Sequence, residues 1–536
     1  MKKYYITTAI PYANAAPHIG TAMDYLYGDI LLRYQTEILD NSALMSIGTD
    51  EHGTKIEQKA KEQNVAPQEL VDSLQPEFVK MRKSLNIDID HTINVRTTDP
   101  DHVRRVQEIW RRLDAAGVIY KSTYEGWYCS GCEAFLTETE AKAIDYKCPD
   151  HNKPLDKLSE ENYYLKVSQF TDQLREFATN NIVPAWRGKE LLELIKNGAQ
   201  DVSISRPKEK LAWGVPVPGD DSQIMYVWVD ALSNYITVLG YPESPTCHPG
   251  GGEMTHESLL SMSHEPEEAK PILVSGSPGD LAGIPDQARN DKVSFWPANV
   301  QIVGKDILRF HAIIWPSILL ALGLELPKKL FVHGFINVGG SKMSKSLGNV
   351  VSPIEIVENY GADAFRYYFS RHIPTFDDGD FTWEKFETAY NGELANDLGN
   401  LVSRVANMIR KYRGGALTPG DVHDDDIFPD MAKLEPNDSV DIGGAIDAIW
   451  GGVQNLNKYV DESKPWEVAK SGDDARLSEI LDHLSGGIIL VAEYLHPFLP
   501  DTSDKIRGIF SGDKLPDEIP ILFPKKYLHT PEPARK

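Results

Sequence analysis

Hydrophobic and polar positions in the first fifty residues predict a strand, a loop and a helix. Residues 4–10 are mostly apolar, aromatic or β-branched, which is typical of a buried strand. Proline and asparagine residues between positions 11 and 17 break this run into a loop. From Thr21 onward the apolar residues recur at helical spacing, as Leu26, Tyr27, Ile30, Leu31 and Tyr34. The pattern therefore predicts a helix that follows a buried strand after one loop.

The predicted helix start carries residues that suit phosphate. His18, Ile19 and Gly20 stand at the turn, where a helix offers unbonded N–H groups and partial positive charge. Gly20 lets a ligand approach the backbone, and the His18 ring can donate to a phosphate oxygen. Taken alone, a His-Gly pair at a helix start is more often an ordinary turn.

A second stretch with similar chemistry lies far downstream. Residues 330–338 form another apolar, strand-like run, and Gly339 and Gly340 lead into a segment with two lysines, Lys342 and Lys345. One interpretation is an exposed, lysine-rich hairpin tip. The other is a mobile loop whose two ammonium groups neutralise a polyphosphate.

Asp50 follows a second predicted strand. Residues 44–56 contain a short apolar run and then a Gly-Thr-Asp turn. If this strand lies beside the first one, Asp50 stands at the carboxyl edge of a parallel sheet, where ligands bind in such folds. Its carboxylate could hold a substrate ammonium group, or it could simply cap the next helix.

Four further stretches of the chain have a distinctive pattern. Residues 101–116 predict a helix, residues 225–235 predict a strand that turns into a helix, and residues 391–499 predict a bundle of successive helices. Trp228 and Tyr235 are core residues by default. Residues 242–294 follow neither period and predict an irregular surface insertion without an assigned function.

Three cysteines and one histidine have the spacing of a structural zinc knuckle. Cys129 and Cys132 form one pair, and Cys148 and His151 form a second pair after a short separation. Each pair occupies a predicted tight turn, so four ligands can converge on one metal ion. The fourth cysteine, Cys247, is remote from them and is expected to take no part.

Composition excludes several classes of protein. The chain of 536 residues is 41% hydrophobic and contains 4 cysteines, so we expect several globular domains in a reducing, cytoplasmic compartment and no disulfide framework. We also expect no membrane span and no signal peptide. A net charge of −24 argues against general nucleic-acid binding, yet a local basic face remains available for RNA. Its candidate residues are Arg404, Arg410, Lys411 and Arg413.

The two phosphate-suited stretches, in this order, resemble the signature motifs of the class I aminoacyl-tRNA synthetases. His-Ile-Gly-Thr at 18–21 matches the His-Ile-Gly-His motif at three of four positions, and Lys-Met-Ser-Lys-Ser at 342–346 matches completely. Within the class, the chain is similar to the methionyl-tRNA synthetases over nearly its whole length except residues 242–294. The similarity rests on the segments 11–14, 48–53, 226–228, 304–306, 310–311, 459–462 and 465–466.

This resemblance implies an α/β fold with a Rossmann-like parallel-sheet catalytic domain, an inserted zinc-knuckle connecting domain and a C-terminal α-helical bundle. The expected ranges are 1–116 and 225–325 for the two halves of the catalytic domain, 117–224 for the connecting domain with its zinc knuckle, 326–385 for a linker domain with the lysine loop, and 386–536 for the helical anticodon-binding domain. The second catalytic half contains the insertion. No oligonucleotide-binding dimerisation module is expected, so a monomer is predicted.

The implied reaction has two steps. L-methionine and ATP first form methionyl-adenylate and pyrophosphate, and the methionyl group is then transferred to methionine tRNA. Asp50 would hold the methionine ammonium group, and the implied side-chain pocket consists of Ile10, Tyr12, Trp228, Ala231, Leu232, Tyr235 and His311. The implied ATP-binding and catalytic residues are His18, Gly20, Thr21, Lys342 and Lys345, with Mg²⁺ accompanying ATP. One structural Zn²⁺ would be bound per chain, and Asn400, Arg404 and Trp466 would read the anticodon, although Trp466 could instead be bundle core.

Two departures and two alternatives accompany this prediction. Thr21 stands where the family has its second signature histidine, and His151 stands where cysteine is commoner. The first alternative is a synthetase for another apolar amino acid, although the large editing insertion of the leucine, isoleucine and valine enzymes is missing. The second is a tRNA-binding relative that has lost catalysis, which only Thr21 and the insertion support.

Overall fold

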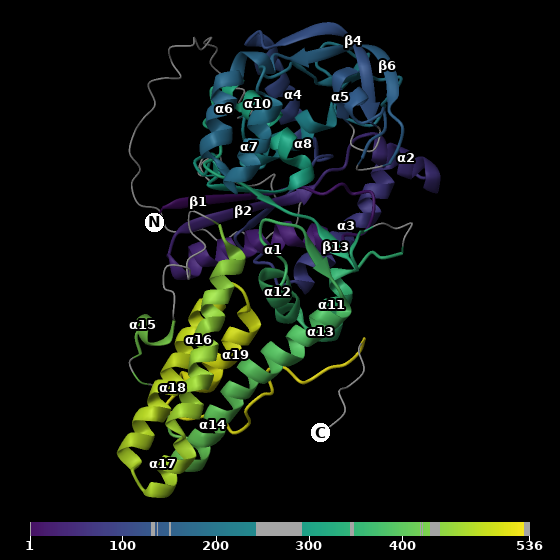
Figure 1. Ribbon diagram of the computed structural model, residues 1–536. Coiled ribbons are helices and arrows are strands. Elements are labelled where there is room, and N and C mark those ends of the chain that lie inside the picture. Colours follow the sequence, from purple (N-terminus) through teal and green to yellow (C-terminus); the bar gives the residue numbers. More distant parts are fainter. Residues whose placement is uncertain are drawn as a thin grey trace, which may run out of the picture.

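The structure has a mixed α/β part and an all-helical part (Figure 1). It is a computed structural model that describes residues 2–129, 134–136, 138–149, 152–242, 292–343, 348–418, 420, 422–428 and 440–529. The part drawn uppermost in Figure 1 contains most of the strands, and the lower part consists of helices. No helix in these ranges is both long and apolar enough to cross a membrane.

A parallel sheet of six strands forms the centre of the first part. Its order is β3-β2-β1-β11-β12-β7, and every neighbouring pair is parallel. The strands are β1 (Lys3–Thr8), β2 (Ser42–Thr49), β3 (Thr92–Arg96), β7 (Ile182–Val183), β11 (Val300–Gly304) and β12 (Leu330–His333). The predicted strands at 4–10 and 44–49 are therefore confirmed as parallel neighbours, because β1 lies directly beside β2.

Helices cover both faces of this sheet. Helix α1 (Ile19–Arg33) packs so closely on one face that a Cβ atom at Gly28 would lie 2.6 Å from Met45 Sδ and 2.9 Å from Thr8 Cγ2. Helix α8 (Val227–Thr237) lies on the opposite face, where the hydroxyl of Tyr5 donates to the carbonyl of Tyr235 at 2.9 Å. The remaining helices of this part are α2 (Thr54–Gln63), α3 (Pro67–Ser84), α4 (Pro100–Ala115), α6 (Thr171–Asn180), α7 (Ala185–Leu194) and α10 (Trp315–Ala321).

The predicted strand within residues 225–235 is mostly wrong. Only the short β10 (Gln223–Met225) is extended, and α8 already begins at Val227. The apolar run Val227–Val229 is buried on all sides, so its period does not distinguish a strand from a buried helix. This difference matters because it places Trp228 on a helix.

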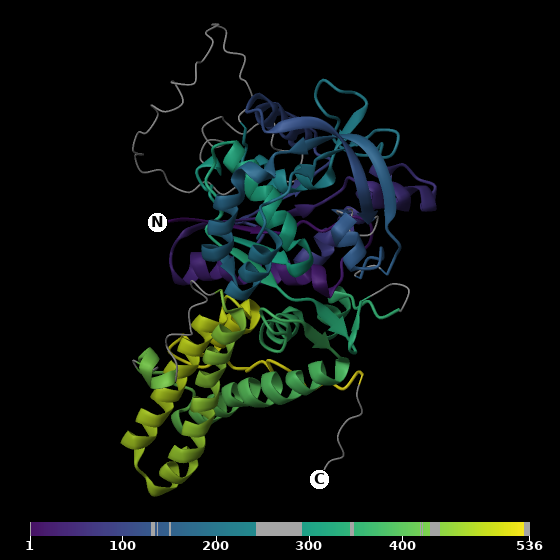
Figure 2. The ribbon, with the colours of Figure 1, turned by 45° about the horizontal axis from the view of Figure 1, so that its top comes forward.

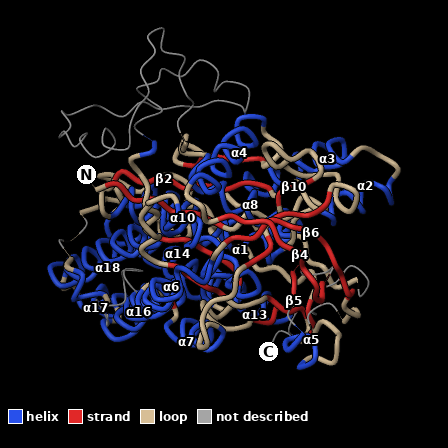
Figure 3. Tube along the Cα trace, turned by 90° about the horizontal axis from the view of Figure 1, so that it is seen from above, coloured by secondary structure: helices blue, strands red, loops and turns tan. Residues whose placement is uncertain are grey.

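A second, antiparallel sheet is inserted between the halves of the first. Its order is β5-β4-β6-β8, with β4 (Ile119–Cys129), β5 (Ala134–Leu136), β6 (Asp156–Leu165) and β8 (Val202–Ser203), and the short α5 (Glu138–Ala143) lies beside it. The strand β9 (Ser205–Pro207) pairs with β10. Figure 3 shows β4, β5 and β6 together on the side of the molecule away from the C-terminal helices.

The apolar run at 330–338 is two strands in different sheets. It breaks at Gly334, where a Cβ atom would lie 2.2 Å from the carbonyl oxygen of Asp377. Strand β12 ends before it, and β13 (Ile336–Val338) pairs with β14 (Ser341–Lys342) and β15 (Gly379–Phe381). Helices α11 (Pro353–Tyr360) and α12 (Ala362–Arg371) follow this small sheet.

The predicted C-terminal bundle is confirmed. Helix α13 (Trp383–Ala389) continues through a π-helical stretch (Tyr390–Gly399) into α14 (Asn400–Arg413), and Figure 2 shows them as one long helix. The other helices are α15 (Asp424–Ile427), α16 (Ile442–Ser463), α17 (Pro465–Ser471), α18 (Asp474–Leu495) and α19 (Pro500–Phe510).

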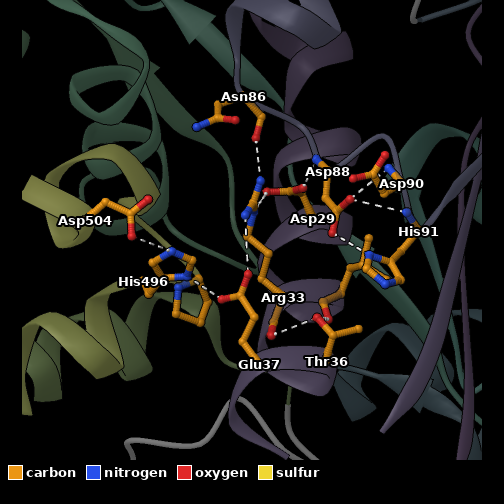
Figure 4. A network of polar contacts seen from close by, with 12 residues as sticks. Asp29, Arg33, Thr36, Glu37, Asn86, Asp88, Asp90, His91, His496 and Asp504 are labelled. Carbon is orange, nitrogen blue, oxygen red and sulfur yellow. Dashed lines mark hydrogen bonds and ion pairs between the residues drawn. The ribbon is translucent and has the colours of Figure 1, made fainter. Parts of the chain in front are cut away.

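The far end of α1 connects the two parts through buried and partly buried charges (Figure 4). Asp29 pairs with Arg33 at 3.0 Å and with the fully buried Arg366 at 2.7 Å. Arg366 also donates to two backbone carbonyls at the end of α18, and Glu37 bonds His496 there. The helix that begins at the phosphate-suited turn therefore ends against the bundle.

Candidate active site

One cavity of about 460 Å³ lies at the carboxyl ends of the central strands. All described residues that were predicted for ATP or methionine line it: Ile10, Tyr12, His18, Gly20, Thr21, Asp50, Trp228, Ala231, Leu232, Tyr235, His311 and Lys342. Lys345 lies outside the described residues. The structure therefore brings together side chains from Ile10 to Lys342, which lie far apart in sequence, at the edge of the sheet where α/β folds bind ligands.

The signature turn is organised by His18. Its Nδ1 accepts a hydrogen bond from the backbone N–H of Thr21 at 3.3 Å, so His18 is the N-cap of α1. A Cβ atom at position 20 would lie 3.0 Å from the His18 ring, which explains the glycine there. Thr21 is the third residue of α1 and contributes its backbone N–H to this bond, so it is not the N-cap.

Asp50 stands at the end of β2 with its backbone paired to the loop after β1. Its N–H donates to the Pro11 carbonyl at 2.9 Å, and its carbonyl accepts from Ala13 at 2.8 Å. Only 3% of Asp50 is exposed. The N-cap of α2 is Gly53, without a capping side chain, so the interpretation of Asp50 as a helix cap is wrong.

One half of the cavity is aromatic and electrically neutral. Trp228 stacks on Phe310 with 3.9 Å between ring centroids, and Tyr235 bonds His311 Nε2 at 2.7 Å. The Nδ1–H of His311 donates to the carbonyl of Ile307 at 3.0 Å, so Nε2 accepts from the Tyr235 hydroxyl in the neutral ring. Burial lowers the pKa of His311 to about 4. Tyr235 and His311 therefore offer polar contacts without a charge near neutral pH.

The other half is charged. Lys342 lines it, and Asp24 contacts His333 Nε2 at 3.1 Å. Burial alone would lower the pKa of His333, but the carboxylate of Asp24 outweighs burial and raises it. Burial raises the pKa of Asp306, which lines the same half.

Sequence reasoning missed the roles of three residues in this charged half. Asp24 lies on α1, about one and a half turns after His18, so helical spacing pointed to it. His333 is the last residue of β12, so its place at a strand end pointed to it. Asp306 lies in a segment that supported the family resemblance, but it received no role. A carboxylate at a strand end or on the first turns of a ligand-facing helix was the available signal.

The lysine segment is a hairpin beside the cavity. Gly339 and Gly340 have φ angles of 61° and 75°, which other residues rarely adopt, and Lys342 pairs with Asn337 across the turn. The Lys342 ammonium lies 4.8 Å from the centroid of the Phe335 ring. The described tip of the hairpin is thus exposed, as in the first interpretation, and Lys342 also lines the cavity, whereas the neutralisation of a polyphosphate by two lysines stays a prediction.

Two of the four predicted zinc ligands, Cys129 and Cys148, lie within the described residues. Cys129 ends β4 and pairs with Ala134 of β5. Cys148 starts a second turn in which its N–H donates to the Lys153 carbonyl at 2.9 Å. Both cysteines are buried, whereas Cys132 and His151 lie outside the described residues. No cluster of three or more potential metal ligands occurs among the residues that the structure describes.

The predicted anticodon residues lie on neighbouring helices of the bundle. Asn400 is exposed at the start of α14, and Arg404 pairs with Asp461 near the end of α16 at 3.0 Å. Trp466, on α17, is half-buried against the bundle core. Figure 1 shows α17 at the end of the bundle away from the sheet.

The proposed basic face beside these residues is partly engaged within the protein. Arg410 donates to the carbonyls of Pro516 and Asp517 at 2.7 and 3.0 Å, and Arg413 pairs with Asp482. Both side chains are therefore engaged within the protein, and the carboxylate of Asp482 offsets the charge of Arg413.

Comparisons with known proteins agree with this architecture. The profile of the family described as "tRNA synthetases class I (M)" matches residues 4–157, 150–249 and 283–406. A protein from Clostridium tetani named methionine–tRNA ligase is 39% identical over 526 residues, which cover 96% of this chain and 74% of that protein. A protein of the same name from Streptomyces coelicolor is 39% identical, with 94% and 89% covered.

A solved structure extends the agreement to three dimensions. The methionyl-tRNA synthetase of Mycobacterium tuberculosis in complex with methionyl-adenylate has a TM-score of 0.83 and 33% identity, and the alignment covers 98% of this chain and 100% of that one. Its apo form has a TM-score of 0.75 at 30% identity, with 98% and 99% covered. The chain therefore belongs to the class I tRNA synthetases of the methionine type.

Proposed function

We propose that this protein is a methionine–tRNA ligase, which activates L-methionine with ATP and transfers the methionyl group to the 3′ end of methionine tRNA. The observation that carries this proposal is the division of one cavity. A neutral aromatic half lies on one side of Asp50, and a charged half lies at the start of α1. Methionine and ATP need these two environments next to each other.

The neutral half suits the methionine side chain. A thioether is apolar and polarizable, and it packs well against aromatic rings such as Trp228 and Tyr235. His311 contributes a polar atom without a charge, since its pKa is about 4. Asp50 supplies a carboxylate for the methionine ammonium group at the open end of this half. The other predicted contacts, from Ile10, Tyr12, Ala231 and Leu232, complete the walls.

The charged half suits ATP. In the first step the methionine carboxylate attacks the α-phosphorus, and pyrophosphate leaves. No covalent intermediate with the enzyme is required, so the residues act by positioning and by stabilising developing negative charge. The His18 turn and the N–H groups of α1 would face the phosphates from one side, and Lys342, with Lys345, from the other. The hydroxyl of Thr21 would donate where the family has its second histidine.

Mg²⁺ would enter with ATP. Asp24 and Asp306 are the described carboxylates that line this half. Together they could hold the Mg²⁺ ion, or they could accept a hydrogen bond from a ribose hydroxyl. When bound, the ion would neutralise charge on the leaving pyrophosphate. The side chain of Asp24 is already oriented by its contact with His333.

Recognition of tRNA would use the bundle. Asn400, Arg404 and Trp466 lie away from the cavity, and single-stranded bases are recognised by stacking and by edge hydrogen bonds. The buried Cys129 and Cys148, with Cys132 and His151, would hold one structural Zn²⁺, which elemental analysis of the purified protein can test. We also propose that the protein is a monomer and that it acts in the cytoplasm.

ATP–pyrophosphate exchange tests the proposed function directly. We expect purified protein to catalyse exchange with methionine and not appreciably with leucine, isoleucine or cysteine. Equal rates with leucine would favour a synthetase for another apolar amino acid. An absence of exchange with every amino acid, together with retained tRNA binding, would favour a relative that has lost catalysis.

A further inference from the structure

The turn that carries Asp50, residues 50–53, is anchored on one side by Glu51. This side chain is fully buried outside the cavity. Arg96 Nε donates to both of its carboxylate oxygens at 2.8 and 3.1 Å, and Thr98 and Gln75 also donate to it. Such a saturated carboxylate fixes the peptide next to Asp50.

His52 anchors the same turn on the other side. Its Nδ1–H donates to Asp230 Oδ2 at 2.7 Å, and the second oxygen of Asp230 accepts from His102 Nε2 at 3.0 Å. The other ring nitrogen of His102 contacts the hydroxyl of Thr237 at 2.7 Å. We call this group the clasp: His52 from the turn, Asp230 from α8 and His102 from α4.

The clasp is buried, and the environment of Asp230 favours its carboxylate form. His52, His102 and Asp230 are 6%, 3% and 1% exposed, and none of them lines the cavity. Burial alone would raise the pKa of Asp230, but the charge interaction with His52 and the hydrogen bond from His102 outweigh burial and lower it to about 2. A buried carboxylate in this state needs both donors, so the clasp resists separation of its three elements.

The position of Asp230 gives the clasp a further consequence. Asp230 lies between Trp228 and Ala231 on α8, which form the side-chain wall of the neutral half, whereas His52 lies two residues after Asp50. The bond between His52 and Asp230 thus connects the turn that carries Asp50 directly to α8, the helix that carries Trp228 and Ala231.

We propose that the clasp sets the distance between Asp50 and α8, and thereby the length of the amino-acid side chain that the pocket accepts. This inference rests on the proposed function. His52, His102 and Asp230 are positioning residues in this reaction, because they act through Asp50 and α8 without touching the substrate.

The test compares His52→Ala with His52→Asn in the full-length protein. The amide nitrogen of asparagine can occupy the position of the imidazole Nδ1, so His52→Asn keeps the bond to Asp230. In ATP–pyrophosphate exchange, normalised to the number of active sites, we expect His52→Ala to raise the KM for methionine about tenfold, with kcat and the KM for ATP within about threefold of wild type. The relative kcat/KM for ethionine, which is one methylene longer, should rise. His52→Asn should restore both values to within about threefold of wild type.

Glu160→Gln serves as the matched control, because Glu160 is also buried and pairs with Arg206 at 3.1 Å in the antiparallel sheet. It should lower the melting temperature without changing the KM for methionine. An unchanged KM and ethionine ratio in His52→Ala, or a failure of His52→Asn to restore them, would overturn the inference. Wild-type protein without methionine-dependent exchange would instead refute the proposed function, so the two failures are distinguishable.

Discussion

The two halves of the cavity contain histidines with opposite behaviour. His311, in the neutral half, has a pKa lowered to about 4 by burial, whereas Asp24 raises the pKa of His333 in the charged half. Both rings are almost fully buried and both line the same cavity. The difference is the partner: His311 bonds a hydroxyl and a carbonyl, whereas His333 bonds a carboxylate.

This comparison shows how one cavity can handle two chemically different substrates. Without an acidic partner, burial disfavours the charged form of an imidazole and lowers its pKa. With an acidic partner, the carboxylate favours the charged form and raises the pKa. Asp50 lies at the border, as the single carboxylate that the neutral half needs. The following experiments test this division.

Removal of Asp50 should have the largest effect. Asp50→Ala leaves the methionine ammonium group without its charged partner in a buried position, so we expect kcat/KM for methionine to fall about a thousandfold. Steady-state exchange kinetics measure this value, and the KM for ATP should change little. A loss of less than tenfold would show that another group holds the ammonium.

Thr21→Ala should have the next largest effect, and it should act on the ATP half alone. The cap of α1 uses only the backbone N–H of Thr21, so the substitution removes the hydroxyl and keeps the cap. A donor aimed at developing charge contributes about 3 kcal/mol, which predicts a fall of about a hundredfold in kcat with little change in the KM for methionine.

Thr21→His is the companion variant, and it should retain activity or raise it. An alanine variant with an unchanged rate, or an inactive histidine variant, would contradict a catalytic role for the Thr21 hydroxyl. The second result would indicate a site that has been adapted to the smaller residue.

The two histidines should give opposite pH dependences of stability. The pKa of His311 falls from 6.5 to about 4 on folding, so the unfolded state binds more protons between these pH values, and stability decreases by about 3 kcal/mol as the pH falls through this window. The pKa of His333 is raised on folding, so its contribution is present below its ordinary pKa of 6.5 and is lost as the pH rises through the higher value.

Melting temperatures of His311→Gln and His333→Gln between pH 4.5 and 8.5 test this pair. Relative to wild type, the first variant should lose less stability toward acid and the second should lose less toward alkali. Parallel curves for all three proteins would contradict the division of the cavity into neutral and charged halves.

Trp466→Ala should have the smallest effect and should leave both halves of the cavity unchanged. Loss of one stacking side chain costs about 1–3 kcal/mol in base recognition, so tRNA charging should fall about tenfold, whereas methionine-dependent exchange should be retained. Comparable losses in both assays would indicate that Trp466 acts as bundle core, which its half-buried position also permits.

The sequence by itself determined the elements whose signals are local. The strand-loop-helix unit around His18, the second strand before Asp50 and the helical C-terminal region follow from periodicity, prolines and glycines, because each depends on neighbours within a few positions. The two signature motifs identified His18, Gly20, Thr21 and Lys342 among the residues that line the cavity, whereas the residues predicted for methionine came from the family resemblance.

Tertiary structure decided what depends on partners distant in sequence. The run at 330–338 is divided into two strands at Gly334, where the backbone of Asp377 approaches closely. Val227–Val229 is helical, which its sequence could not predict because a buried helix and a buried strand share the same apolar composition. Three contacts join residues from separate elements. They are the bond between Tyr235 and His311, the contact between Asp24 and His333, and the clasp at Asp230. The pKa values and orientations of these side chains depend on burial and on the charge of the partner. Neither burial nor the partner can be read from the local sequence.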